Sequence, residues 1–175
     1  MFLSDAVTWN APDDPHPARA ASQRSYSAVA NGDLAAWLAV YAEDAVLEDP
    51  VGPSMFDPAG AGHHGHEGLT AFWEKVIAAV AGFEFTITDS FANPGGNTCA
   101  NIGRIKAIFD DGSHATTDLI MVYVVDDDGR ITSMKAFWEP ARTMASLVSG
   151  QRGDRRGEGG SGGRPVGPGD LVGGQ

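Results

Sequence analysis

The chain has 175 residues, of which 42% are hydrophobic, so it is long enough for one domain with a buried core. Acidic residues outnumber lysine and arginine by 23 to 12, and the resulting net charge of −11 argues against binding to nucleic acid or an anionic membrane. The single cysteine, Cys99, excludes an internal disulfide, and no apolar run is long enough to span a membrane. The N-terminal residues also lack the order of a signal peptide, so we expect a cytoplasmic protein.

Composition divides the chain into three parts. We expect an N-terminal extension over residues 1–15, one domain over residues 16–148, and a tail rich in glycine and arginine over residues 149–175. From Gly150 onward the chain holds 11 of its 23 glycines and almost no apolar residues. Such a segment cannot bury enough surface to offset the entropy of ordering, so the sequence predicts a disordered tail.

Three helices are expected in the first half of the chain, over residues 17–31, 34–41 and 67–80. Gly32 provides a stop for the first helix, and Asp33 can cap the second. The other two helices carry apolar residues at helical spacing, which predicts that each packs against a core. These residues are Leu34, Trp37, Leu38 and Tyr41, followed by Leu69, Phe72, Trp73, Val76, Ile77 and Val80.

From Gly82 onward the apolar residues recur with a period of two, which predicts strands. We expect a short strand at residues 45–49 and a four-stranded antiparallel meander at residues 83–91, 100–109, 115–125 and 130–138. Three helices packed on one face of a curved antiparallel sheet form an α+β fold. A sheet that curls around a helix leaves a cone with an apolar mouth, where small molecules can bind.

The segment Glu48-Asp49-Pro50-Val51-Gly52 places a carboxylate at the end of the first expected strand. Pro50 lacks a backbone N–H and favours a strand end, and it pushes Asp49 towards extended backbone angles. Taken alone, these five residues are typical of a turn in which Asp49 bonds its own backbone. A base held at the same point could instead serve a pocket.

Several segments together resemble the ketosteroid isomerase branch of the NTF2-like superfamily, which also includes SnoaL-like proteins. They are Gly32-Asp33-Leu34, residues 41–52, Gly65 with Leu69 and Phe72-Trp73, and residues 128–138. The resemblance implies an NTF2-like cone, a homodimer formed through the sheets, and a deep apolar pocket for a steroid or other polycyclic small molecule. We expect neither a cofactor nor a bound metal.

The resemblance gives Asp49 the role of general base, which moves a proton between two carbons next to an enolised ketone. Partial desolvation at the mouth of an apolar cavity would raise the pKa of this carboxylate and make it a better base. Trp138 falls where the family has an aromatic beside the base, although a core aromatic at the end of the last strand would look the same. Further side chains expected at the substrate are Tyr41, Trp73, Met121, Tyr123 and Phe137.

The family stabilises its dienolate oxygen with a tyrosine on the first helix and a protonated aspartate on a strand, and neither is matched here. Counting without gaps puts Ser25 and Met121 at those two positions. Tyr26 lies one residue, or about 100°, from the tyrosine position and is the candidate catalytic phenol. Asp118 has the opposite strand parity to Met121 and should face away, whereas Tyr123 shares the face of Met121.

Three functions therefore fit the sequence. The first is an isomerase with Asp49 as base and Tyr26 or Tyr123 as donor to the oxyanion. The second is a SnoaL-like polyketide cyclase or an epoxide hydrolase, which would need an Asp-Arg-Asp set for which Arg104 is the only candidate inside the strands. The third is a non-catalytic binding module, which needs the cone but no ionised Asp49.

The loop before the third helix contains His63, His64 and His66, and Asp57 precedes them. Imidazole and carboxylate groups suit zinc, but their spacing here matches no standard zinc site. The sequence favours a solvated lid over the mouth of the pocket.

Overall fold

The computed structural model describes residues 3–150, and within them one seven-stranded sheet forms the body of the protein. The strands lie in the order β1-β4-β5-β6-β7-β2-β3. Their bounds are β1 (Val7–Trp9), β2 (Tyr41–Glu48), β3 (His63–His64), β4 (Gly82–Ala92), β5 (Thr98–Ile108), β6 (His114–Val125) and β7 (Ile131–Phe137). The antiparallel meander from β4 to β7 is confirmed, but β1 pairs with β4 and β2 with β7 in parallel, so the sheet is mixed.

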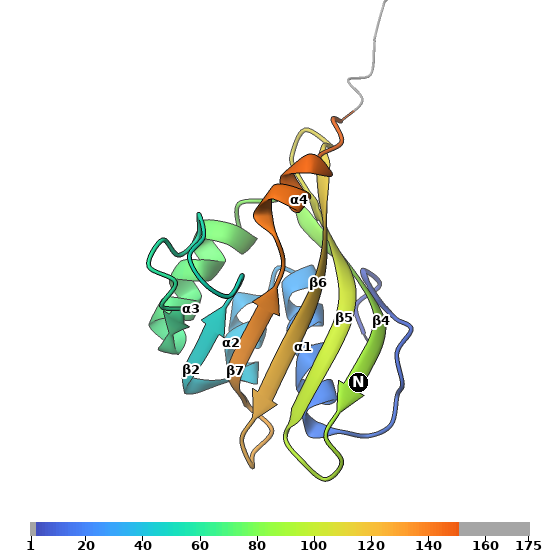
Figure 1. Ribbon diagram of the computed structural model, residues 1–175, viewed down its shortest axis with the longest axis vertical. Coiled ribbons are helices and arrows are strands. Elements are labelled where there is room, and N and C mark those ends of the chain that lie inside the picture. The colour runs from blue at the N-terminus through green and yellow to red at the C-terminus, as the bar shows by residue number, and fades with distance from the viewer. Residues whose placement is uncertain (1–2, 151–175) are drawn as a thin grey trace, which may run out of the picture.

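Three helices cover one face of this sheet and a fourth lies at its end, which confirms the α+β class. They are α1 (Pro17–Ala30), α2 (Leu34–Val40), α3 (Gly65–Phe72) and α4 (Pro140–Ala145). Figure 1 shows α1 and α2 behind the sheet, α3 at one side and α4 at its upper end, while the middle of the front face carries no helix. Within residues 3–150, no helix is both long and apolar enough to cross a membrane.

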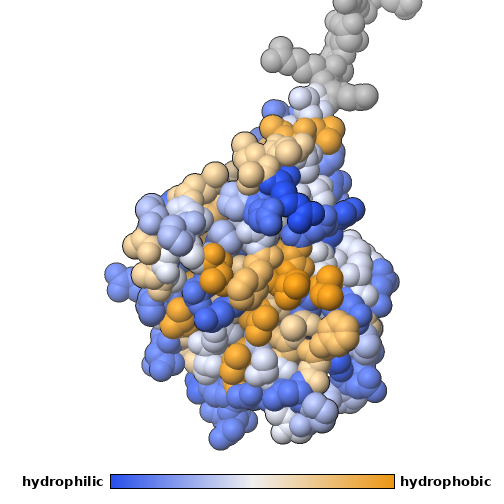
Figure 2. Space-filling view, viewed as in Figure 1, coloured by the Kyte–Doolittle hydropathy of each residue, from blue (hydrophilic) through white to orange (hydrophobic). Residues whose placement is uncertain are grey.

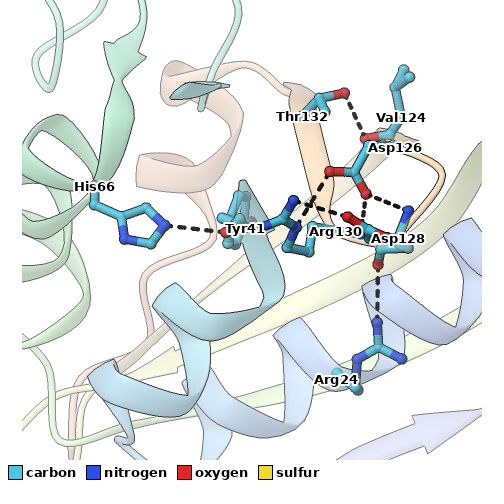
Figure 3. A network of polar contacts seen from close by, with 9 residues as sticks. Arg24, Tyr41, His66, Val124, Asp126, Asp128, Arg130 and Thr132 are labelled. Carbon is cyan, nitrogen blue, oxygen red and sulfur yellow. Dashed lines mark hydrogen bonds and ion pairs between the residues drawn. The ribbon is translucent and has the colours of Figure 1, made fainter. Parts of the chain in front are cut away.

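The first helix, which carries Ser25 and Tyr26, is fixed at its start and at its middle. At its start, the imidazole Nδ1 of His16 accepts a hydrogen bond from the backbone N–H of Ala18 (3.2 Å), and a proline occupies the first turn. At its middle, the guanidinium of Arg24 donates to the carbonyl of Gly129 in the β6–β7 turn (3.1 Å; Figure 3). These contacts hold α1 against the concave face of the sheet.

The third predicted helix differs from the expectation of one helix over residues 67–80. It begins at Gly65, and from Trp73 to Ile77 the chain continues as a π-helical turn, η1. The backbone N–H of Ala78 donates to the carbonyl of Trp73 (2.8 Å), five residues earlier. A pattern of apolar spacing does not distinguish this wider turn from an α-helix.

Residues 1–15 were expected to form an extension outside the domain, but part of this segment belongs to the sheet. β1 pairs with β4 in parallel, with Val7 opposite Phe85, and Val7 is buried. Three residues are too few to show a strand pattern in the sequence. The predicted tail lies outside the described residues apart from residues 149 and 150.

Gly103 on β5 allows β4 and β5 to approach closely. A Cβ atom at this position would lie 2.7 Å from the carbonyl oxygen of Thr86 and 2.8 Å from Cδ1 of Ile87. We therefore expect Gly103→Ala to lower the free energy of unfolding by about 1–3 kcal/mol, measured by urea denaturation. Gly82→Ala is the matched control, because no atom lies within 4 Å of its added Cβ. Equal midpoints for the two variants would contradict the prediction.

Candidate functional site

Two adjoining cavities lie on the concave side of the sheet. The outer cavity has a volume of about 330 Å³ and the inner one about 90 Å³. They share five lining residues, which are Asp49, Phe72, Val76, Phe83 and Ile105. Asp49 is the only acidic residue of this shared wall, so a single carboxylate is accessible from both cavities.

The outer cavity is largely apolar. Its walls come from the loop that follows β2, from α3 and η1, from β5 and β6, and from α4. Phe56 of that loop packs near both Phe72 and Trp138, with ring centroids 6.5 and 6.2 Å apart. This part of the loop therefore covers the cavity beside Asp49, whereas none of the histidines of the predicted lid lines either cavity. Apolar walls of this kind suit a rigid hydrophobic ligand.

The inner cavity is lined by hydroxyl groups as well as apolar groups. Ser25, Tyr26, Tyr41 and Tyr123 all contribute to its wall, together with Met121. Burial raises the pKa of the Tyr26, Tyr41 and Tyr123 phenols above the ordinary value for tyrosine. Each phenol therefore stays protonated at neutral pH and can donate a hydrogen bond.

Asp49 follows the end of β2, and Trp138 follows the end of β7. Because the two strands are parallel, these residues meet, and the indole Nε1–H of Trp138 donates to Oδ1 of Asp49 (2.6 Å). Burial raises the pKa of Asp49 to about 6, and the bond from Trp138 partly opposes that shift. The carboxylate is thus oriented at one oxygen and has a proton affinity suited to a base.

Tyr26 points into the inner cavity and is only 2% exposed. Its hydroxyl oxygen accepts a hydrogen bond from Nδ2 of Asn101 (2.9 Å), and its O–H lies 3.5 Å from the sulfur of Met121. Its ring meets that of Tyr123 edge to face, with centroids 5.8 Å apart. Neither Asn101 nor these contacts could be identified from the sequence.

Ser25 and Tyr41 form a separate polar contact in the same cavity. The hydroxyl groups of these two residues lie 3.4 Å apart, and Ser25 Oγ also accepts from the indole N–H of Trp37 (3.1 Å). The curled sheet encloses a wide strip of α1, so the adjacent positions 25 and 26 are both buried. Ser25 thus contacts the hydroxyl of Tyr41, while Tyr26 places its own phenol in the same cavity.

Two residues expected at the substrate lie elsewhere. Phe137 is 48% exposed on the convex face of the sheet, because it adjoins the inward-facing Ala136 on β7 and consecutive strand residues face opposite ways. Trp73 is buried but lines neither cavity, and it packs against Trp37 with ring centroids 5.3 Å apart. Asp118 faces outward as expected.

The histidines of the loop are separated by the fold. The ring of His63 packs on Phe72, His64 contacts the carbonyl of Ala61, and His66 contacts the carbonyl of Tyr41 at 3.1 Å (Figure 3). Among residues 3–150, no three histidine, cysteine or acidic side chains are placed to hold a metal ion.

Comparison with known proteins agrees with this geometry. The SnoaL-like domain family matches residues 22–134. A steroid delta-isomerase of Nocardioides simplex is 34% identical over 122 residues, which are 70% of this chain and 89% of that protein. A Δ5-3-ketosteroid isomerase from Mycobacterium sp. is 33% identical, with a TM-score of 0.69 over 77% of this chain and 98% of that one. A Mycobacterium tuberculosis protein in complex with estradiol-17β-hemisuccinate is 32% identical, with a TM-score of 0.68 over 77% and 99%.

The raised pKa of Asp49 has a measurable effect on stability. The folded protein holds this proton more tightly than the unfolded chain does, so stability falls as the pH rises from the ordinary pKa of 3.8 to about 6 and stays lower above that pH. We expect Asp49→Asn to increase the free energy of unfolding by about 1–3 kcal/mol at pH 8, and the gain should fall towards zero as the pH approaches 4. Denaturant titrations across this range measure the difference. Asp118→Asn, on the convex face, should give no such gain.

Proposed function

Since this chain belongs to the SnoaL-like family of NTF2-like proteins, we propose that it is an isomerase that moves a proton within a steroid or other polycyclic ketone. The observation that carries this proposal is the position of Asp49. Its carboxylate lies on the wall shared by an apolar cavity and a smaller one that contains the phenol of Tyr26. A base and a protonated donor thus border one enclosed space.

In the proposed reaction, Asp49 removes a proton from the carbon next to the ketone, and the electron pair of that C–H bond forms an enolate. The O–H of Tyr26 donates to the developing oxyanion. Asp49 then returns the same proton to a carbon further along the conjugated system, and the double bond shifts. The reaction is redox-neutral and needs no co-reactant.

The electrostatics of Asp49 support this role. With a pKa of about 6, the carboxylate is ionised at neutral pH, yet it binds a proton more strongly than an exposed aspartate does. Since Trp138 occupies Oδ1, the other oxygen, Oδ2, is the one left to act on a substrate. The apolar walls exclude water and so strengthen the interactions inside the site.

Met121 limits the expected rate. A thioether cannot donate a hydrogen bond, so position 121 supplies no donor, and Tyr26 is the one phenol proposed to donate to the oxyanion. One such donor typically contributes a factor of about 10²–10³ to a rate. We therefore expect turnover lower by about that factor than in a site with two donors.

The position of Arg104 disfavours an epoxide hydrolase. This side chain lies on the convex face, where it forms an ion pair with Asp118 (2.7 Å), and both groups are largely exposed. The residues that line the two cavities include no arginine. A cyclase and a non-catalytic binding protein remain as the outcomes of a failed isomerase assay.

The assay uses a Δ5-3-ketosteroid and follows the absorbance of the conjugated enone. We expect the wild type to isomerise it, Asp49→Asn to lose nearly all activity, and Tyr26→Phe to lose a factor of about 10²–10³ in kcat. Activity of the wild type should rise with pH through an apparent pKa near 6. Steroid binding without turnover would favour a binding module instead.

Trp138→Phe provides a control for the assignment of this pKa. It keeps an aromatic ring but removes the hydrogen bond that lowers the pKa of Asp49. The rising limb of the pH profile should therefore move to higher pH. A limb that stays in place would assign the pKa to another group.

We also propose that two copies of the chain pair through the convex face of the sheet. Four large apolar side chains from different strands are exposed there: Phe91, Ile102, Ile120 and Phe137. Figure 2 shows apolar residues gathered in the middle of this helix-free face. A contiguous apolar patch of this kind is typical of a protein interface.

Phe137→Glu tests the dimer. The charge would lie within the proposed interface, so we expect a shift from dimer to monomer in sedimentation velocity. Ala35→Glu is the matched control, because Ala35 is exposed on α2, on the opposite side of the sheet. A monomeric wild type would refute this part of the proposal.

A further inference from the structure

Asn101 is a fully buried polar residue on β5, behind the inner cavity. Its amide nitrogen lies 2.9 Å from the hydroxyl oxygens of both Ser22 and Tyr26. Its carbonyl oxygen accepts a hydrogen bond from Ser90 (2.7 Å). All the hydrogen-bonding groups at this end of the side chain thus have partners.

Arg19 fixes the direction of the hydrogen bond between Ser90 and Asn101. A guanidinium can only donate, and Arg19 donates through Nε to Ser90 Oγ (3.1 Å) and through Nη2 to the Ser90 carbonyl (2.9 Å). Ser90 Oγ therefore accepts from Arg19 and uses its own proton on Asn101 Oδ1. This places the amide nitrogen of Asn101, and not its oxygen, towards Tyr26.

Ser22 fixes the direction of the second hydrogen bond that the Asn101 amide nitrogen makes. Its hydroxyl donates to the backbone carbonyl of Arg19 (2.8 Å), so its oxygen accepts from Asn101. One amide proton of Asn101 goes to Ser22 and the other goes to Tyr26. The oxygen of Tyr26 is then an acceptor, and its own proton must point elsewhere.

We propose that Asn101 is a positioning residue that holds the hydroxyl proton of Tyr26 towards the inner cavity. The sulfur of Met121, 3.5 Å away, is the nearest resting acceptor for this proton, and a thioether accepts only weakly. The hydroxyl of Tyr123, which also lines the inner cavity, is another neighbour of the Tyr26 hydroxyl. A ketone oxygen bound in the cavity is a stronger acceptor than the sulfur and would replace it. The inference rests on the proposed function, and it explains how one phenol can act without the neighbouring acid of the family.

The charge of Arg19 strengthens the same arrangement. No carboxylate of residues 3–150 forms an ion pair with it. Its positive charge lies at the far end of the chain Arg19–Ser90–Asn101–Tyr26, and linked hydrogen bonds polarise one another. The polarisation makes the Tyr26 O–H a better donor.

The orientation can be measured without any ligand. In NMR spectra of the wild-type protein, the side-chain amide protons of Asn101 should show NOEs to Tyr26 and Ser22. The slowly exchanging hydroxyl proton of Tyr26 should show an NOE to the methyl group of Met121. NOEs from the Asn101 amide protons to Ser90, together with no NOE between the Tyr26 hydroxyl proton and the Met121 methyl group, would overturn the proposal.

The effect of this orientation on a substrate can be measured with a bound ketone. With a 3-ketosteroid labelled with ¹³C at its carbonyl, the carbonyl stretch should lie at lower frequency in the wild type than in Tyr26→Phe. Asn101→Leu should lose most of this difference and lower kcat about 10- to 100-fold, with KM within about twofold. Ser27→Ala is the control, because it removes a buried hydroxyl from the helix that carries Tyr26. The Ser27 hydroxyl accepts from the backbone N–H of Ser4 and contacts neither Asn101 nor the Tyr26 hydroxyl. It should keep the wild-type frequency.

The two proposals fail in different ways. Wild-type frequency and kcat in Asn101→Leu, with normal folding, would overturn the role of Asn101 and leave the isomerase intact. A wild type that shows the expected NOEs but no turnover would refute the isomerase and leave the orientation of Tyr26 established.

Discussion

Parallel pairing between β2 and β7 is the constraint on which the site depends. Because the strands run in the same direction, their carboxyl ends lie at one edge of the sheet, and the residues that follow them become neighbours. The indole of Trp138 thereby reaches Asp49, which lies 89 residues earlier in the chain. The backbone N–H of Val51 also donates to the carbonyl of Ala136 (2.9 Å), which fixes the segment after β2. Backbone pairing thus positions the Asp49 carboxylate, and Trp138 sets its orientation.

Burial in the cavity raises the pKa of the carboxylate and of the phenols alike, but it suits them to different roles. Apolar walls around Asp49 disfavour its charged form, so its pKa rises towards neutrality. The same burial keeps the phenols of Tyr26 and Tyr123 protonated. Desolvation therefore produces a stronger base on one wall and permanent donors on another, which is the division of roles that proton transfer from a carbon acid requires.

The order of helices and strands, and the positions of Asp49 and Trp138 after the ends of two strands, could be predicted because they depend on local patterns and strand ends. Phe137 was misplaced because two consecutive residues, 137 and 138, were both assigned to the cavity although strand neighbours face opposite ways. Asn101 could not be found, since its partners come from α1 and β4, far away in the sequence. A short parallel strand such as β1 also leaves no periodic pattern.

Met121 gives the Tyr26 O–H only a weak hydrogen-bond acceptor. A buried donor with a poor acceptor costs about 1–3 kcal/mol, and the weak contact with sulfur recovers only part of that cost. A ketone oxygen in the inner cavity would relieve it, and an enolate oxygen, which carries more charge, would relieve it further. The interaction would therefore strengthen as the proposed reaction proceeds, and only such a differential gain accelerates a chemical step. The hydrogen-bond chain from Arg19 through Ser90 to Asn101 preserves that gain. It makes the Tyr26 oxygen an acceptor from Asn101, so the Tyr26 proton rests on a weak acceptor, the sulfur of Met121, and is available to the substrate.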